Sequence, residues 1–163
     1  LLFLMLSATV TQMIMNHYES ALAVMPQLAG FIPMLTGTGG NCGSQSSTLV
    51  IRGISVGEIE FGDLFRVIFK EIRVAILISL ILSVVNGIRI IVMGQGDALV
   101  ALTIGLTMAC TIVIAKVVGC TLPLVAEKIG LDPAIMATPL ISTLVDISTI
   151  SVYFAIVSAV FSL

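Results

Sequence analysis

The stretch TPLISTLVDISTISVYFAIVSAV, residues 138–160, lies in the last hydrophobic segment of the chain and contains a single charged residue, Asp146. The segment, residues 132–163, is long enough to cross a bilayer as a helix, which takes about 20 apolar residues. A carboxylate near the middle of such a helix is costly, so it normally faces a water-filled path, a cation or a partner group. Asp146 is therefore the first candidate for a functional residue.

Oxygen-bearing side chains recur around Asp146 at helical spacing. They follow one another at intervals of four, four, three and four positions, which places them on one face of a helix. This face comprises Thr138, Ser142, Asp146, Thr149 and Tyr153. The remaining surface of the helix is apolar and suits lipid or neighbouring helices. The alternative is that Asp146 simply bonds to another helix and has no role in function.

The beginning of this segment carries its own signals. Asp132 stands before Pro133, and an aspartate N-cap followed by proline at the first helical position is a strong helix start. Capping is thus the simplest role for Asp132. Pro139 lacks the N–H that would bond to the carbonyl of Ile135, so we expect that carbonyl to be free to face the path.

The composition indicates a membrane protein. Of the 163 residues, 58% are hydrophobic and 10% are charged, and the mean hydropathy is +1.21. An ordinary soluble domain has about 25% charged residues. We expect an all-α integral membrane protein with about five transmembrane helices, and the net charge of -2 argues against nucleic-acid binding. The expected helices cover residues 1–18, 21–54, 62–92, 98–127 and 132–163.

Residues 37–48 are rich in glycine and polar side chains. Such a segment is tolerated at membrane depth only where its backbone is buried in protein or lines a cavity. On a helix, the spacing places four polar residues on one face: Asn41, Gln45, Thr48 and Arg52. Close helix packing is the alternative, because small residues let membrane helices approach. Packing explains the glycines but not Asn41 and Gln45 together.

The basic residues predict the orientation of the chain. Five of them lie in two connections expected on the same side: Arg52, Arg66, Lys70, Arg73 and Lys128. Arg89 lies on the other side. The positive-inside rule makes the first side cytoplasmic, with a cytoplasmic N-terminus and an external C-terminus in the plasma (inner) membrane. Lys116, inside the fourth span, is expected to snorkel toward the cytoplasmic interface or to neutralise Asp146.

The two polar faces offer oxygen ligands, which suit a hard cation better than a soft one. Mg²⁺ loses its water reluctantly and is commonly held through one or two carboxylates with several waters retained. One aspartate per chain fits this chemistry if the chain forms a two-fold dimer with its last helix at the axis. Two copies of Asp146 would then match the charge of one divalent ion. This chemistry alone does not exclude Na⁺, K⁺ or H⁺ as the ion.

Two stretches of the chain, in this order, resemble the MgtE family of magnesium channels and transporters. The first is PMLTGTGGNCGSQ, residues 33–45, followed by Arg52 and by the Gly-Glu-Ile turn at residues 57–59. The second is the final helix, from the Asp-Pro-Ala at residues 132–134 to the Thr-Leu-Val-Asp at residues 143–146. The resemblance covers nearly the whole chain.

The resemblance implies a homodimer of five-helix protomers in the lipid bilayer, with the pore on the two-fold axis. It places Asp146 at the central Mg²⁺ site, and Asp132 at an acidic position of the cytoplasmic mouth that can join a regulatory Mg²⁺ site. The pore lining that we expect comprises Asn41, Gln45, Gly39, Gly40, Thr138, Ser142 and Thr149. Thr138 departs from the family, because some members carry an asparagine there.

The family places an N-terminal helical domain and paired CBS modules before the membrane part. We expect both to be absent from these residues, and with them the closure of the pore by intracellular Mg²⁺. The family's own cytoplasmic regulatory domain is then a further expected partner, besides the second copy of the chain.

The resemblance favours a non-enzymatic protein that passes Mg²⁺ into the cytoplasm down its electrochemical gradient. The first alternative is a secondary transporter coupled to another cation, because such folds also have broken helices and polar groups at the membrane midplane. The second is an intramembrane enzyme. A carboxylate dyad would need another aspartate at depth, and we expect Asp63, Asp97 and Asp132 to lie at interfaces.

Overall fold

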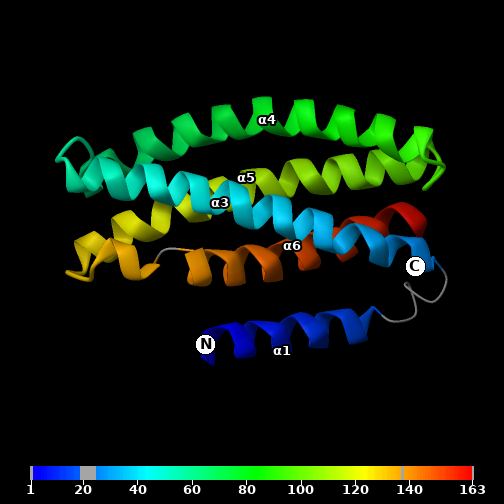
Figure 1. Ribbon diagram of the computed structural model, residues 1–163, viewed down its shortest axis with the longest axis horizontal. Helices are drawn as coiled ribbons and strands as arrows, with labels where there is room; N and C mark the ends of the chain where they lie inside the picture. Colours follow the sequence, from blue (N-terminus) through cyan, green and yellow to red (C-terminus); the bar gives the residue numbers. More distant parts are fainter. Residues whose placement is uncertain (1, 19–24, 137, 163) are drawn as a thin grey trace.

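The apolar runs of the sequence form helices. The computed structural model describes residues 2–18, 25–136 and 138–162. The helices within them are α1 (Leu2–His17), η1 (Pro26–Phe31), α3 (Ile32–Ser55), η2 (Phe61–Asp63), α4 (Leu64–Val92), α5 (Ala98–Lys128), η3 (Pro133–Met136) and α6 (Thr138–Phe161), where η marks a short 3-10 helix. All regular structure in these residues is helical, which confirms the predicted all-α class (Figure 1).

Prolines account for the two places where the helices differ from expectation. The expected helix over 21–54 is the 3-10 helix η1 followed by α3, with a proline in the first turn of each. Residues 21–24 lie outside the described part. The expected helix over 132–163 is likewise divided into η3 and α6. Pro139 lies in the first turn of α6, where the helix needs no N–H donor. The predicted continuous helix with Pro139 in its interior is therefore wrong, while the free carbonyl of Ile135 stays a prediction.

The helices run lengthwise beside one another, and α5 is at the centre of the arrangement (Figure 1). It packs against α3, α4 and α6, while α1 packs against α6. α5 buries side chains along its whole length, from Val100 to Ala126. The two helices that carry the polar faces of the sequence, α3 and α6, also pack against each other.

Glycine allows α3 and α5 to cross with their backbones in contact. A Cβ atom added to Gly119 would overlap the carbonyl oxygen of Gly43 and lie 3.0 Å from its Cα. A Cβ atom on Gly43 would lie 2.8 Å from a methyl group of Ile141 and 3.2 Å from the carbonyl oxygen of Ala115. A larger residue at Gly119 would require α3 to move, and one at Gly43 would require the Ile141 side chain to shift. Part of the glycine-rich segment thus serves packing.

Three described helical segments are long and apolar enough to cross a membrane: residues 61–92, 98–128 and 139–161. The outer surface of α4 carries exposed leucine and valine side chains, including Leu77, Leu80 and Val84. Such a surface suits lipid rather than water. The chain is therefore a multi-pass membrane protein. α3 is the most polar of the long helices because of its glycine, serine, threonine and amide residues.

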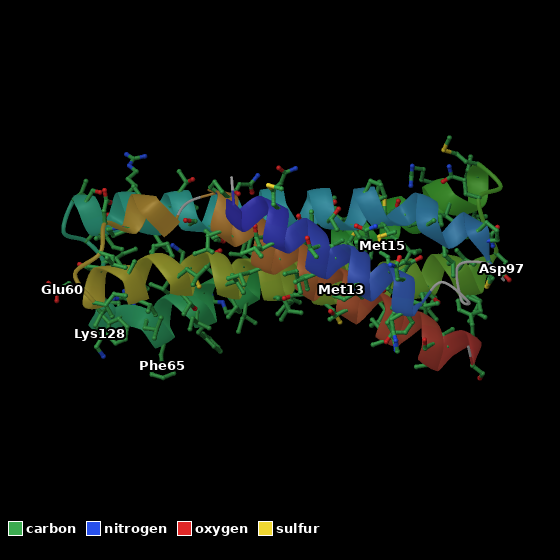
Figure 2. The ribbon with its side chains drawn as sticks, turned by 90° about the horizontal axis from the view of Figure 1, so that it is seen from below. Met13, Met15, Glu60, Phe65, Asp97 and Lys128 are labelled. Carbon is green, nitrogen blue, oxygen red and sulfur yellow. The ribbon has the colours of Figure 1, made fainter. Side chains whose placement is uncertain are left out.

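The charged connections gather at one end of the bundle. Glu60 and Lys128 are found together at that end, whereas Asp97 lies at the opposite end (Figure 2). The ammonium group of Lys128 lies 3.9 Å from the ring centroid of Phe61, so the end of α5 contacts the segment that leads into α4. The structure thus brings the two basic connections to the same side, as their expected shared location requires.

Candidate functional site

A polar groove runs between α3 and α6 and contains Asp146. Its volume is about 340 Å³. α3 contributes Pro33, Thr36, Gly37, Gly40, Asn41 and Ser44, and α6 contributes Ser142 and Asp146. A Cβ atom on Gly40 would lie 3.7 Å from the Ser142 hydroxyl, so the two helices are close at this point. Four of the predicted site residues, Asn41, Gly40, Ser142 and Asp146, therefore meet in one groove.

The carboxylate of Asp146 is half-buried in this groove. Among the residues that the structure describes, it has no ion-pair partner and no side-chain hydrogen bond. The groove supplies hydroxyl and amide groups around it, whereas the nearby thiol of Cys42 is buried on another face of α3. This donor set suits a hard cation that keeps part of its water.

The polar face of α3 extends beyond the groove. Asn41, Gln45, Thr48 and Arg52 are all exposed on this helix, as their spacing predicts. A second groove of about 520 Å³ is lined by Asn41, Ser44, Gln45, Thr48 and Leu49. Because it shares Asn41 and Ser44 with the Asp146 groove, the two form one polar surface that leads toward the charged end of the bundle.

Gly39 and Thr149 do not line either groove of the single protomer, and their assignment to the pore lining stays a prediction. A Cβ atom on Gly39 would lie 2.7 Å from methyl groups of Thr111 and Val145 and 3.3 Å from the Thr149 hydroxyl. Thr149 itself is 2% exposed. Both residues lie where α3, α5 and α6 pack together, so helix contact explains them.

Tyr153 also leaves the predicted oxygen-bearing face of α6. Its side chain is fully buried, and its hydroxyl donates a hydrogen bond to the carbonyl of Leu28 in η1, at 2.9 Å. The predicted face therefore divides along its length. Ser142 and Asp146 reach the groove, whereas Thr149 and Tyr153 face neighbouring helices.

Thr138 and Asp132 lie at the other end of α6. Thr138 is the first residue of this helix, and its side chain lies outside the described part of the structure. Asp132 is exposed, and its carboxylate accepts a hydrogen bond of 2.9 Å from the N–H of Ala134. Asp132 thus caps a helix start, as predicted, but the helix that it caps is η3 and not α6.

Lys116 neither snorkels nor faces Asp146, which corrects both expectations for it. Its side chain is buried, and its ammonium group lies 3.0 Å from a carboxylate oxygen of Glu71. This pairing of Lys116 with Glu71 was not predicted from the sequence. The missed signal is the spacing of small and polar residues on α4, because Glu71, Ala75 and Ser79 follow one another at four-residue intervals and are all buried.

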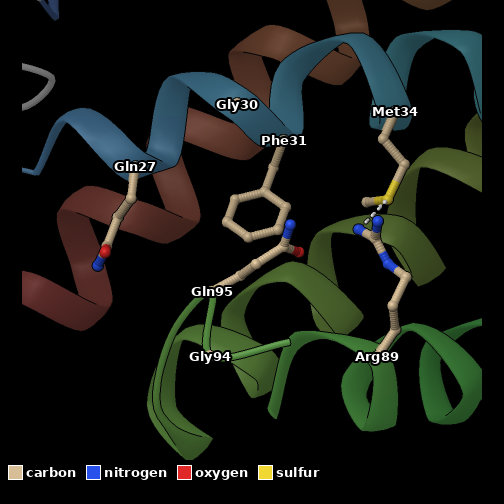
Figure 3. Close-up of a pocket in the computed structure, with 7 residues that line it drawn as sticks. All are labelled: Gln27, Gly30, Phe31, Met34, Arg89, Gly94 and Gln95. Carbon is tan, nitrogen blue, oxygen red and sulfur yellow. Dashed lines mark hydrogen bonds between the residues drawn. The ribbon is translucent and has the colours of Figure 1, made fainter. Parts of the chain in front are cut away.

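Another cavity, of about 440 Å³, lies at the end of the bundle that contains the turn between α4 and α5. Figure 3 shows Arg89 beside Met34, with Gln27 and Gln95 also lining the space. The guanidinium donates hydrogen bonds to the sulfur of Met34 at 3.4 Å and to the side-chain oxygen of Asn86 at 3.1 Å. The lining of this cavity includes the Arg89 cation and no carboxylate, so the cavity does not resemble a cation site.

Comparison with known proteins finds a family model and several relatives that match most of the chain. Residues 32–156 match the family model MgtE, described as a divalent cation transporter. The chain is 35% identical over 156 residues to the magnesium transporter MgtE of Thermus thermophilus, covering 96% of this chain and 34% of that protein. It is 36% identical over 159 residues to the magnesium transporter MgtE of Bacillus subtilis, covering 98% of this chain and 35% of that protein.

A third relative, the magnesium transporter MgtE of Enterococcus faecalis, is 35% identical over 161 residues, which cover 97% of this chain and 34% of that protein. The chain thus spans about a third of the length of the relatives it matches. The residues that the family model matches contain all of α3 and most of α6, including every residue that lines the Asp146 groove. By the extent of this match, the chain belongs to the MgtE family of divalent cation transporters.

Proposed function

We propose that this chain is the ion-conducting part of a magnesium transporter, in which partly hydrated Mg²⁺ passes Asp146 into the cytoplasm down its electrochemical gradient. The proposal rests on a difference between two carboxylates in long helices, namely whether each has an ion-pair partner. Glu71 has a protein cation beside it, whereas Asp146 lies in a polar groove with no ion-pair partner in the described residues. A carboxylate in that situation favours a cation from solution.

The proposed assembly is a homodimer in which the grooves of two copies face each other across a two-fold axis. Among the described residues of one protomer, no group of three or more His, Cys, Asp or Glu side chains could hold a metal ion. A single Asp146 leaves Mg²⁺ half neutralised, and a second copy would match its charge. The retained waters would bond to the hydroxyl and amide groups of Asn41, Ser44 and Ser142.

The same assembly accounts for α3 as a transmembrane helix despite its polarity. Its 24 residues are long enough to cross the hydrocarbon core at about 1.5 Å per residue. Its exposed polar face would be hidden from lipid at the dimer axis. With α1 this gives five transmembrane helices per protomer. The end with Arg52 and Lys128 is cytoplasmic by the positive-inside rule, so the N-terminus is cytoplasmic and the C-terminus external.

The test is Mg²⁺ uptake into proteoliposomes that contain the full chain, without a Na⁺ or pH gradient. Asp146→Asn should reduce uptake about tenfold or more, because a charge-assisted contact worth about 1.5 kcal/mol or more is lost. Asp97→Asn is the matched control. Asp97 accepts a hydrogen bond from the N–H of Val100 at the start of α5, and asparagine caps a helix about equally well.

The uptake measurements distinguish the proposed function from its alternatives. Equal uptake by both variants would remove Asp146 from the ion path. Uptake that begins only when a Na⁺ or proton gradient is imposed would favour a cation-coupled secondary transporter. The proposed dimer is tested separately by the molecular mass of the purified chain in detergent, which should correspond to two copies.

A further inference from the structure

Ser46, Glu71 and Lys116 form a buried polar cluster outside the ion groove. The Lys116 ammonium donates hydrogen bonds to a carboxylate oxygen of Glu71 at 3.0 Å and to the Ser46 hydroxyl at 3.1 Å. The Ser46 hydroxyl in turn donates to the same carboxylate oxygen, at 2.5 Å. The three residues come from α3, α4 and α5, and their exposed fractions are 0%, 6% and 4%.

Such a cluster needs an explanation, because charges are expensive to bury. An ion pair inside a protein often gains little over apolar packing, since both charges lose their hydration. Its hydrogen bonds are directional, however, whereas apolar contacts between smooth helix surfaces are not. A buried polar cluster can therefore hold one helix arrangement among several that pack about equally well.

α3 is a helix for which this matters. It meets α5 through glycine, at Gly43 and Gly119, and small residues offer few ridges that would resist rotation or sliding. α4 packs mainly against α5. The Ser46 hydroxyl therefore ties α3 to an ion pair that α4 and α5 already form. One directional contact joins all three helices at one depth in the bundle.

The opposite side of α3 faces the ion groove. Ser46 lies on the buried face of the helix, whereas Asn41 and Ser44 line the groove with Asp146. Because a helix turns as a nearly rigid body, a rotation of α3 at Ser46 also moves Asn41 and Ser44 relative to Asp146.

We propose that the Ser46–Glu71–Lys116 cluster is a positioning cluster that sets the width of the groove and, through it, the preference for Mg²⁺ over larger divalent ions. The inference rests on the proposed function, since it assumes that the groove is the ion path. Mg²⁺ requires near-octahedral geometry at short distances, whereas Ca²⁺ accepts larger and more variable shells. If the groove is no longer held at one width, the chain should therefore lose its preference for Mg²⁺ over Ca²⁺ before it loses the ability to pass divalent ions.

The sharpest test compares Ser46→Ala with Ser47→Ala. The two serines are adjacent on α3 and equally buried, at 0% and 1% exposed, but the Ser47 hydroxyl has no hydrogen-bond partner among the described residues. Both changes remove one hydroxyl and leave the Lys116–Glu71 pair in place. Ser46→Ala should lower the ratio of Mg²⁺ to Ca²⁺ flux in proteoliposomes about fivefold, the change that a hydrogen bond of ordinary net strength represents. Ser47→Ala should leave the ratio unchanged.

A second readout does not depend on transport. Asn41→Cys, introduced with each serine change, should react with a charged methanethiosulfonate reagent at a rate that differs several-fold between the two backgrounds. The same chains without the introduced cysteine give the background from Cys42, Cys110 and Cys120. This rate reports the position of the α3 groove face even if the unsubstituted chain carries no Mg²⁺, so it separates failure of this inference from failure of the proposed function.

The results that would overturn the inference are specific. Equal flux ratios and equal thiol reaction rates in the two variants would show that the cluster does not position α3. A loss of thermal stability in Ser46→Ala with no change in ratio or rate would make the cluster purely structural. Equal changes in both variants would assign the effect to packing around α3 rather than to the hydrogen bonds of Ser46.

Discussion

The hydroxyl of Tyr153 in α6 donates a hydrogen bond of 2.9 Å to the carbonyl oxygen of Leu28 in η1. Both residues are fully buried, and the bond joins the C-terminal half of one groove helix to the segment that precedes the other. η1 thus has a polar anchor on α6 in addition to its apolar contacts. Removing this anchor should affect stability without touching the groove.

Tyr153→Phe should lower the free energy of unfolding by about 1 kcal/mol, because it leaves a buried carbonyl without its donor and changes little else. Mg²⁺ flux should stay near that of the unsubstituted chain. Tyr18→Phe is the matched control, since the Tyr18 ring stacks on Phe154 with ring centroids 4.6 Å apart and keeps that contact without its hydroxyl. Thermal unfolding in detergent measures the stability of both variants, and uptake into proteoliposomes measures their Mg²⁺ flux. Equal loss of stability in the two variants would contradict the role of the Tyr153 bond.

Gly119→Ala should destabilise the bundle by about 1 to 3 kcal/mol or more, because the added methyl group overlaps the backbone of α3 at Gly43. The control is Gly87→Ala in α4, where nothing lies within 4 Å of the added Cβ. There the better helix propensity of alanine should stabilise the helix by about 0.5 to 1 kcal/mol. The midpoint of thermal unfolding should fall in Gly119→Ala and rise in Gly87→Ala. A downward shift for both variants would mean that the α3–α5 crossing is not the cause.

Lys116→Met should lower stability by about 3 to 5 kcal/mol, because Glu71 then remains buried without its cation. Adding Glu71→Met to the same chain should restore part of the loss, since two apolar residues replace the pair. Lys70→Met, at the exposed position immediately before Glu71 on the same helix, is the control and should be nearly neutral. The yield of folded protein and the unfolding midpoint measure the effect. If the double variant is no more stable than Lys116→Met, the unpaired carboxylate is not the source of the loss.

Asn41→Ala should reduce Mg²⁺ flux, but less than Asp146→Asn does, because an amide contacts the ion only through its waters in the proposed site. Gln95→Ala, in the exposed turn between α4 and α5, removes an amide that does not line the groove and should leave flux unchanged. Uptake at several Mg²⁺ concentrations separates weaker binding from slower passage. An Asn41 variant with unchanged flux at every concentration would place this amide outside the ion path.

The helical class, the membrane location and the two polar segments that meet in the groove can be predicted from the sequence. These follow from local properties, because apolar runs predict spanning helices and a period of about 3.6 residues predicts which side chains share a face. Asn41, Gln45, Thr48 and Arg52 are accordingly exposed on one helix. The lone carboxylate of Asp146 was recognisable because its cost in an apolar segment does not depend on the neighbouring helices.

What each polar residue faces depends on how the helices pack against one another. Periodicity gives the direction of a side chain around its own helix but not the helix that covers it. Thr149 and Tyr153 share the predicted face with Asp146, yet neighbouring helices bury them. Lys116 could have reached an interface, Asp146 or another carboxylate, and the way α3, α4 and α5 pack selects Glu71. Such partners are set by close approach in space, which glycines make possible and sequence spacing does not specify.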